Sequence, residues 1–148
     1  MNELKIWNNF KELQKYGKFE SNYYLGYVYF VEYGKHVKIG CTKNPIKRLG
    51  SLYSNAKSYH DIELGRIYIT PKHTNYRENE SILHSYFINK RKENSELFSI
   101  TIEDAIDSIS KIPLSFLDDS LEKEKREVEM LEGIKNTYCN QRIKTTYY

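Results

Sequence analysis

The stretch that most constrains the fold of this chain runs from Gly26 to Arg48 and reads GYVYFVEYGKHVKIGCTKNPIKR. Residues 27–31 are aromatic or β-branched, which suits the pleated surface of a strand. Residues 36–39 alternate polar and apolar side chains, as a half-buried strand does. Gly34 between the two runs permits a tight reversal. The stretch therefore predicts a β-hairpin.

The same stretch predicts that the hairpin leads directly into a helix. Asn44 is a favourable N-cap residue, and Pro45 suits the first helical position. A helix that begins there, and runs to about residue 54, carries Arg48 on its first turns. This order of elements leaves Tyr29, Lys38 and Arg48 free to converge on one place.

Flanking segments add further elements. Residues 62–69 read as a third strand, in which Gly65 predicts a bulge. Residues 101–112 predict a helix capped by Thr101 and stopped by Pro113. The N-terminal segment predicts an amphipathic helix that packs on the domain, from apolar residues at helical spacing: Leu4, Trp7, Phe10 and Leu13.

Another helix is expected from Asn75 to about Lys90, because Asn75 and Glu78 have the spacing of a capping box. Glu80 and His84 are four residues apart, so they share one face of this helix. The apolar face predicted for it consists of Ile82, Leu83, Tyr86 and Phe87.

Together these elements predict a small α/β (α+β) fold, in which a three-stranded, mainly antiparallel sheet is flanked by helices. Residues 1–22 would form an N-terminal helical extension and residues 23–112 the domain itself. Residues 113–148 would form a C-terminal helix and tail. Apolar residues at heptad-like positions predict that this last helix packs on its own domain or forms a homodimer.

The motifs resemble those of the GIY-YIG endonuclease superfamily. Gly26-Tyr27-Val28-Tyr29 is followed by Lys38-Ile39-Gly40, and Arg48 lies eight residues beyond that glycine. The sequence is most similar to a phage-associated branch in which the second motif reads K-I-G, and the similarity runs from about residue 24 to residue 98. The downstream patterns E-x-x-x-H and E-x-F of that branch are matched by Glu80 with His84 and by Glu96 with Phe98.

The resemblance implies a metal-dependent DNA endonuclease that hydrolyses phosphodiester bonds. It implies that Glu80 holds one divalent ion, Mg²⁺ or Mn²⁺, and that Arg48 holds the phosphate through its planar guanidinium. Tyr29 would lie beside the scissile group. Asn94 is a candidate for the asparagine that follows the metal-binding glutamate in this family.

Lys38 departs from the family pattern, because it stands where the second motif usually has a tyrosine near the attacking water. A lysine is a poor base at neutral pH unless desolvation or nearby cations lower its pKa. Three interpretations stay open: Lys38 acts as the base, Lys38 holds phosphate while Tyr29 or His36 orients water, or the site no longer catalyses.

Each of these residues taken alone also has an ordinary structural interpretation. Tyr29 would be a strand aromatic, and Lys38 and Arg48 would be solvated side chains. Glu80 competes with Glu78 for the metal-binding role. Either glutamate suits a plain helix surface, and the auxiliary candidates His36 and His84 suit packing or exposed positions equally well.

DNA contact is expected from basic residues around the first helix and in a later loop: Lys43, Lys47, Arg48 and Arg91. They would bind backbone phosphates with little sequence preference. The net charge of +3 is too small to establish this partner. The alternatives are a non-catalytic DNA-binding module or regulator on the same scaffold, and a protein-interaction or inhibitor protein.

The sequence also indicates the compartment. Its N-terminus lacks the apolar core of a signal peptide, and no run approaches the length of a membrane span. Cys41 and Cys139 are its only cysteines and do not form a disulfide framework or a zinc pattern. A cytoplasmic protein without membrane contact is expected.

Overall fold

The computed structural model describes residues 5–19, 24–111 and 129–130. The chain divides into two compact units, residues 1–118 and 119–148. All helices and strands named below belong to the first unit. The predicted C-terminal helix, with its predicted dimer contact, lies outside the described residues except for positions 129 and 130.

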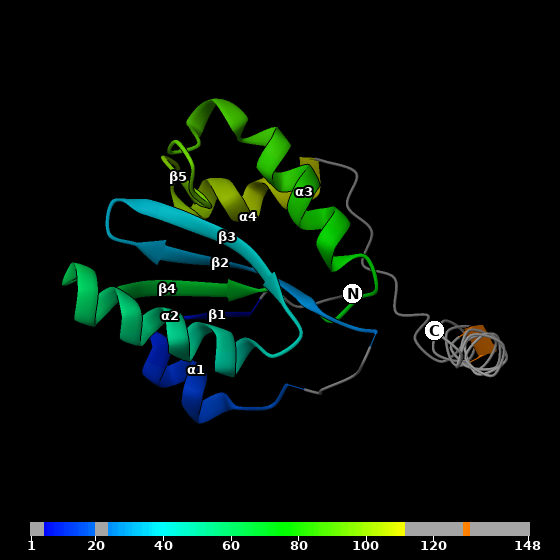
Figure 1. Ribbon diagram of the computed structural model, residues 1–148, viewed down its shortest axis with the longest axis horizontal. Helices are drawn as coiled ribbons and strands as arrows, with labels where there is room; N and C mark the ends of the chain where they lie inside the picture. The colour runs from blue at the N-terminus through cyan, green and yellow to red at the C-terminus, as the bar shows by residue number, and fades with distance from the viewer. Residues whose placement is uncertain (1–4, 20–23, 112–128, 131–148) are drawn as a thin grey trace, which may run out of the picture. The chain divides into compact units, whose positions relative to one another are not determined.

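An antiparallel five-stranded sheet forms the centre of the first unit, with the strand order β1-β4-β2-β3-β5 (Figure 1). The three predicted strands occupy its middle, so the prediction of a three-stranded sheet was wrong in number but not in orientation. The strands are β1 (Lys5–Trp7), β2 (Tyr27–Tyr33), β3 (His36–Thr42), β4 (Leu64–Ile69) and β5 (Leu97–Phe98).

The N-terminal segment corrects the prediction of one continuous helix. Residues 5–7 form β1, which pairs with β4, and within residues 5–19, which the structure describes, the helix is confined to α1 (Phe10–Tyr16). The Asn9 side chain caps α1 by accepting a hydrogen bond from the amide of Glu12 at 3.0 Å. Trp7 is nevertheless buried against the sheet, so the apolar spacing reflected burial rather than one helix.

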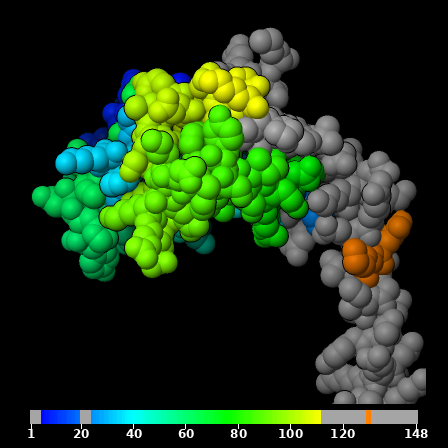
Figure 2. Space-filling model, turned by 90° about the horizontal axis from the view of Figure 1, so that it is seen from above, coloured from blue at the N-terminus to red at the C-terminus, as the bar shows by residue number. Residues whose placement is uncertain are grey.

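Helices cover both faces of the sheet (Figure 1). One face carries α1 and α2 (Pro45–His60), and the other carries α3 (Tyr76–Tyr86), a 3₁₀ turn at Ile88–Lys90 and α4 (Ile102–Lys111). Figure 2 looks onto the face covered by α3 and α4.

The alternation of β2 divides the hydrophobic core between these two layers. Tyr27, Tyr29 and Val31 face α1 and α2, whereas Val28 and Phe30 face α3 and α4. All five are at most 5% exposed. Complete burial of a side chain of this size contributes roughly 1.5–3 kcal/mol, so both faces hold the hairpin in place.

Local signals in the sequence fix several boundaries. The side chain of Asn44 accepts a hydrogen bond from the Lys47 amide at 3.2 Å and caps α2, as predicted. Thr101 and Asp104 cap α4 reciprocally, since each side chain accepts a hydrogen bond from the other residue's amide. Asn75 takes the predicted N-cap position of α3, but the predicted capping box does not form, because its side chain makes no cap bond.

Two further boundaries differ from the sequence prediction. Helix α2 continues to His60, six residues beyond the expected end. Helix α3 ends at Tyr86 and passes into the 3₁₀ turn, and Tyr86 is 49% exposed instead of packed in the core. The register between β2 and β4 shifts beside Gly65, as its predicted bulge requires. Among the described residues, no helix is long and apolar enough to cross a membrane.

Candidate active site around Tyr29

Tyr29 and Gly40 lie opposite each other in the hairpin and form the floor of the candidate site. They are paired in the register of β2 and β3. A Cβ atom added to Gly40 would lie 2.5 Å from Cζ of Tyr29 and closer still to its hydroxyl. The hydroxyl end of the phenol ring therefore lies against the glycine, and a side chain at position 40 would displace it.

The Tyr29 hydroxyl is buried without a hydrogen-bond partner among the described residues. Burial raises the pKa of Tyr29 to about 12, although the nearby Arg48 guanidinium acts in the opposite direction. The phenol is therefore protonated at neutral pH. Its O–H group is a donor with no acceptor in the described protein, which is expensive unless a ligand supplies one.

Arg48 reaches this hydroxyl from the first turns of α2. Its amide donates a hydrogen bond to the Asn44 carbonyl at 3.0 Å, so the N-cap fixes where the side chain starts. The neighbouring Tyr29 hydroxyl raises the pKa of Arg48, whose side chain is otherwise exposed. A permanently charged guanidinium, largely exposed, thus lies next to a buried phenol.

Glu80 approaches from α3, which packs on the opposite face of the sheet. It is half-buried, and its negative charge acts on both Tyr29 and Cys41. Burial raises the pKa of the Cys41 thiol to about 12, and the neighbouring Glu80 carboxylate raises it further. The competing candidate Glu78 is exposed and acts on His73 instead. Of the two glutamates, Glu80 is therefore the one near Tyr29.

Lys38 is engaged by a residue that the sequence analysis did not place in the site. Its Nζ lies 2.9 Å from a carboxylate oxygen of Glu96, and the lysine side chain is only 14% exposed. Glu96 also acts on Tyr29, Arg48 and Cys41. The E-x-F pattern marked this glutamate, but no spacing rule linked it to Lys38.

The carboxylate near Tyr29 suits a divalent ion that takes most of its ligands from water and substrate phosphate. Among the described residues, no group of three or more histidine, cysteine, aspartate or glutamate side chains could hold a metal ion. Mg²⁺ is often held by one or two carboxylates, with water and substrate phosphate completing its shell. Glu80 can supply one such carboxylate, whereas Glu96 is paired with Lys38.

The auxiliary candidates lie in different surroundings. His84 packs on Phe98, and its Nε2 lies 2.9 Å from the Ile39 carbonyl, to which it must donate. His36 pairs with Tyr33 beside the hairpin turn, four residues or about 13 Å along the strand from Gly40. Asn94 is exposed in a turn with a φ of 56°. Within the part of the chain that the structure describes, none of these three residues forms a hydrogen bond or ion pair with Tyr29.

The basic residues expected to contact DNA fall into two groups. Lys43 and Lys47 flank the N-cap of α2, next to Arg48, and Lys47 is exposed. Arg91 lies in the loop before β5, where its Nε donates to the Ser95 carbonyl at 2.6 Å. The first group therefore adjoins Arg48, whereas Arg91 is held by its own loop.

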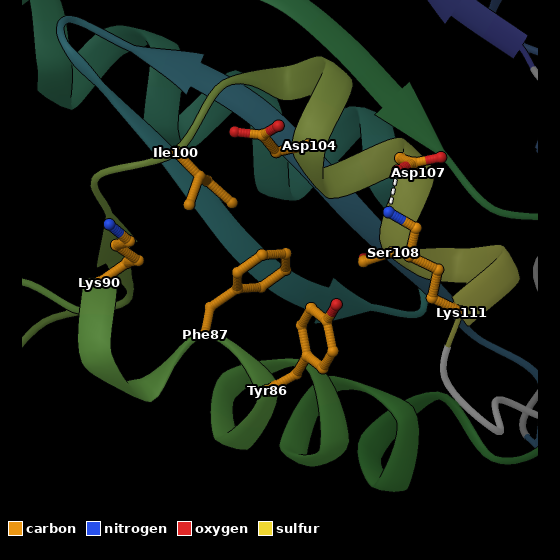
Figure 3. A pocket seen from close by; sticks show the side chains of 8 residues that line it. All are labelled: Tyr86, Phe87, Lys90, Ile100, Asp104, Asp107, Ser108 and Lys111. Carbon is orange, nitrogen blue, oxygen red and sulfur yellow. Dashed lines mark ion pairs between the residues drawn. The ribbon is translucent and has the colours of Figure 1, made fainter.

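A hollow of about 190 Å³ between α3 and α4 lies outside this cluster (Figure 3). An ion pair of 2.6 Å between Asp107 and Lys111 crosses its rim. The hollow contains none of the predicted site residues. It is lined by Tyr86, Phe87, Lys90, Ile100, Asp104, Asp107, Ser108 and Lys111.

The fold is that of an α+β domain in which Arg48, Glu80 and Glu96 act electrostatically on a buried tyrosine of the central hairpin. The chain belongs to the T5orf172 domain family, whose model matches residues 26–113. That domain is related to GIY-YIG-like nucleases and occurs in phage T5 proteins. The match confirms the relation that the motifs predicted, and it carries no specific activity. No curated protein and no solved structure matches the chain significantly.

Proposed function

We propose that this protein is a metal-dependent DNA endonuclease of the GIY-YIG type. The observation that supports the proposal is the buried Tyr29 hydroxyl, which interacts with the Arg48 guanidinium and feels the charge of the Glu80 carboxylate. Arg48 and Glu80 start from helices on opposite faces of the sheet. A buried hydroxyl with no acceptor for its proton, next to a cation and in the field of a carboxylate, suits a phosphate ligand better than a purely structural role.

The proposed roles follow from the charge and protonation of each group. Arg48 neutralises the phosphoryl oxygens as negative charge builds on them. Tyr29 stays protonated and donates its hydrogen bond to the attacking water or to a phosphate oxygen, because burial holds its pKa at about 12. Lys38 is not assigned the role of base, because its amino group is engaged in the ion pair with Glu96.

Glu80 is the proposed ligand of one Mg²⁺ or Mn²⁺ ion. When bound, such an ion supplies charge that stabilises the leaving oxygen. Lys43 and Lys47 would hold the neighbouring backbone phosphates, and Arg91 would extend that contact. Such contacts carry little sequence information and weaken as salt rises.

Nicking of supercoiled plasmid in the presence of Mg²⁺ or Mn²⁺ tests the proposal. Arg48→Ala and Glu80→Gln should each abolish nicking, because the first removes the proposed phosphate-binding guanidinium and the second the proposed metal-binding carboxylate. Glu78→Gln is the matched control, since it removes an exposed carboxylate two residues away on the same helix. The proposal fails if wild-type protein does not nick, or if nicking survives both substitutions.

A second candidate function is DNA binding without cleavage. It is favoured by the ion pair between Lys38 and Glu96. This pair engages the lysine that stands where the resembling family has a tyrosine. This function predicts salt-sensitive DNA binding with no nicking under either metal. Cleavage that depends on Glu80 would exclude it.

A further inference from the structure

We infer that Glu96 is a positioning residue, whose carboxylate holds the Lys38 ammonium in the site and keeps it from acting as a general DNA-backbone contact. The inference deepens the proposed function and rests on it for the catalytic part. It assigns two effects to Glu96: it limits the affinity for DNA, and it raises the rate at which bound DNA is cleaved.

The backbone places Glu96 firmly beside Lys38. Lys38 is paired with Leu97 in the register of β3 and β5, so these two strands are neighbours at this point. The Ile39 amide donates a hydrogen bond to the Glu96 carbonyl at 3.2 Å, which fixes the glutamate next to β3. The 2.9 Å ion pair is therefore built on a strand pairing and not on two free surface side chains.

The neighbouring charges give this pair a role beyond stability. Glu96 acts on Tyr29 and Arg48 as well, so its carboxylate stands among the groups of the proposed site. With the pair intact, Lys38 is neutralised and Arg48 is the cation left to meet a phosphate. Without the carboxylate, Lys38 and Arg48 would form a doubly positive cluster that grips phosphate in several positions.

A phosphate gripped in several positions is bound more tightly but presented to the site less often. Loss of Glu96 should therefore strengthen DNA binding and slow cleavage. If Glu96 only supported the fold, its loss would weaken DNA binding and slow cleavage together. The opposite signs of the two changes distinguish positioning from folding.

Glu96→Gln tests the inference, with Glu93→Gln as the matched control, because Glu93 is an exposed carboxylate in the same loop. Binding of a short double-stranded oligonucleotide is measured against salt concentration, and plasmid nicking is measured at saturating protein. For Glu96→Gln the salt slope should steepen by about one unit, since about one further phosphate contact forms. Nicking at saturation should fall at least about tenfold, and Glu93→Gln should match the wild type.

Other outcomes separate this inference from the endonuclease proposal. If wild-type protein binds without nicking, the endonuclease proposal fails, and the salt slope alone decides the inference. If wild-type protein does not bind DNA, the inference is overturned as well. Thermal unfolding of Glu96→Gln, Lys38→Met and the double variant tests whether the two side chains act as a unit, and additive effects in that cycle would also overturn the inference. So would a Glu96→Gln protein that behaves like Glu93→Gln, or one that loses binding and cleavage together.

Discussion

Gly40→Ala is the substitution whose cost can be worked most directly from the geometry. The added Cβ would lie 2.5 Å from Cζ of Tyr29 and 2.9 Å from its Cε2, whereas ordinary contacts begin at 3.4 Å. The ring would therefore have to move by roughly 1 Å within a packed core, and Tyr29 is only 1% exposed. Overpacking of this kind costs about 1–3 kcal/mol. We expect the midpoint of thermal unfolding to fall by roughly 4–12 °C.

The matched control is Gly50→Ala on α2, whose added Cβ would lie 3.3 Å from Cζ of Phe10. A shift of a few tenths of an ångström suffices there, and alanine favours the helix by about 0.5–1 kcal/mol. This variant should keep its unfolding temperature within a few degrees of the wild type.

A double variant identifies Tyr29 as the obstacle to Gly40→Ala. Tyr29→Leu shortens the side chain and leaves room for the new methyl group, so the double variant should lose less stability than the two single losses together. Differential scanning calorimetry measures all four proteins. Strict additivity, or a Gly40→Ala protein as stable as the wild type, would show that the ring does not lie against the glycine.

Three further expectations follow from individual contacts. Tyr29→Phe removes an unpartnered buried hydroxyl, so urea unfolding should show unchanged or slightly higher stability, while plasmid nicking slows on the order of 10²-fold. Thr101→Ala removes the N-cap hydroxyl that accepts a hydrogen bond from the Asp104 amide. It should lower the free energy of unfolding by about 1 kcal/mol in the same assay. The hydrogen-bonded Arg66 guanidinium holds the pKa of Glu32 below its usual value of 4.5. The stability from this pair is therefore present above about pH 4.5 and is lost as the pH falls through the lowered pKa, so Glu32→Gln should reduce the acid sensitivity measured by unfolding from about pH 6 to about pH 3.

The centre of the fold could be predicted because its signals are local. The hairpin follows from alternating side chains and from Gly34, which adopts a φ of 60° in the turn. The start of α2 follows from Asn44 and Pro45, and both take the predicted positions. Each of these features depends on residues within a few positions of one another, which is the range over which sequence patterns are informative.

The edges of the sheet could not be predicted in the same way. β1 has three residues and β5 has two, too few to display a period of two. They are strands because partners are available, as when Leu97 and Phe98 pair with β3. In β1, the burial of Trp7 coincided with the helical spacing of Phe10 and Leu13, so periodicity indicated the wrong element while still identifying core residues.

The candidate site depends on contacts across long stretches of sequence. The order of motifs suggested that Tyr29 and Arg48 would meet, and the structure brings them together. The ion pair of Lys38 with Glu96 joins residues that no helical or strand period relates. A charged side chain that turns inward from the end of a strand has no signature in composition or spacing, so Glu96 became visible only in three dimensions.

The pairing of Lys38 with Glu96 gives a physical reason why a lysine can occupy a position where the resembling family has a tyrosine. An unpaired ammonium at 14% exposure would suffer desolvation, and Arg48 already supplies a positive charge to the same cluster. A carboxylate at 2.9 Å offsets this cost and returns the local charge to that of a neutral tyrosine. The lysine and the glutamate therefore act as one neutral pair in electrostatic terms, and Arg48 is the cation that interacts directly with the buried Tyr29 hydroxyl.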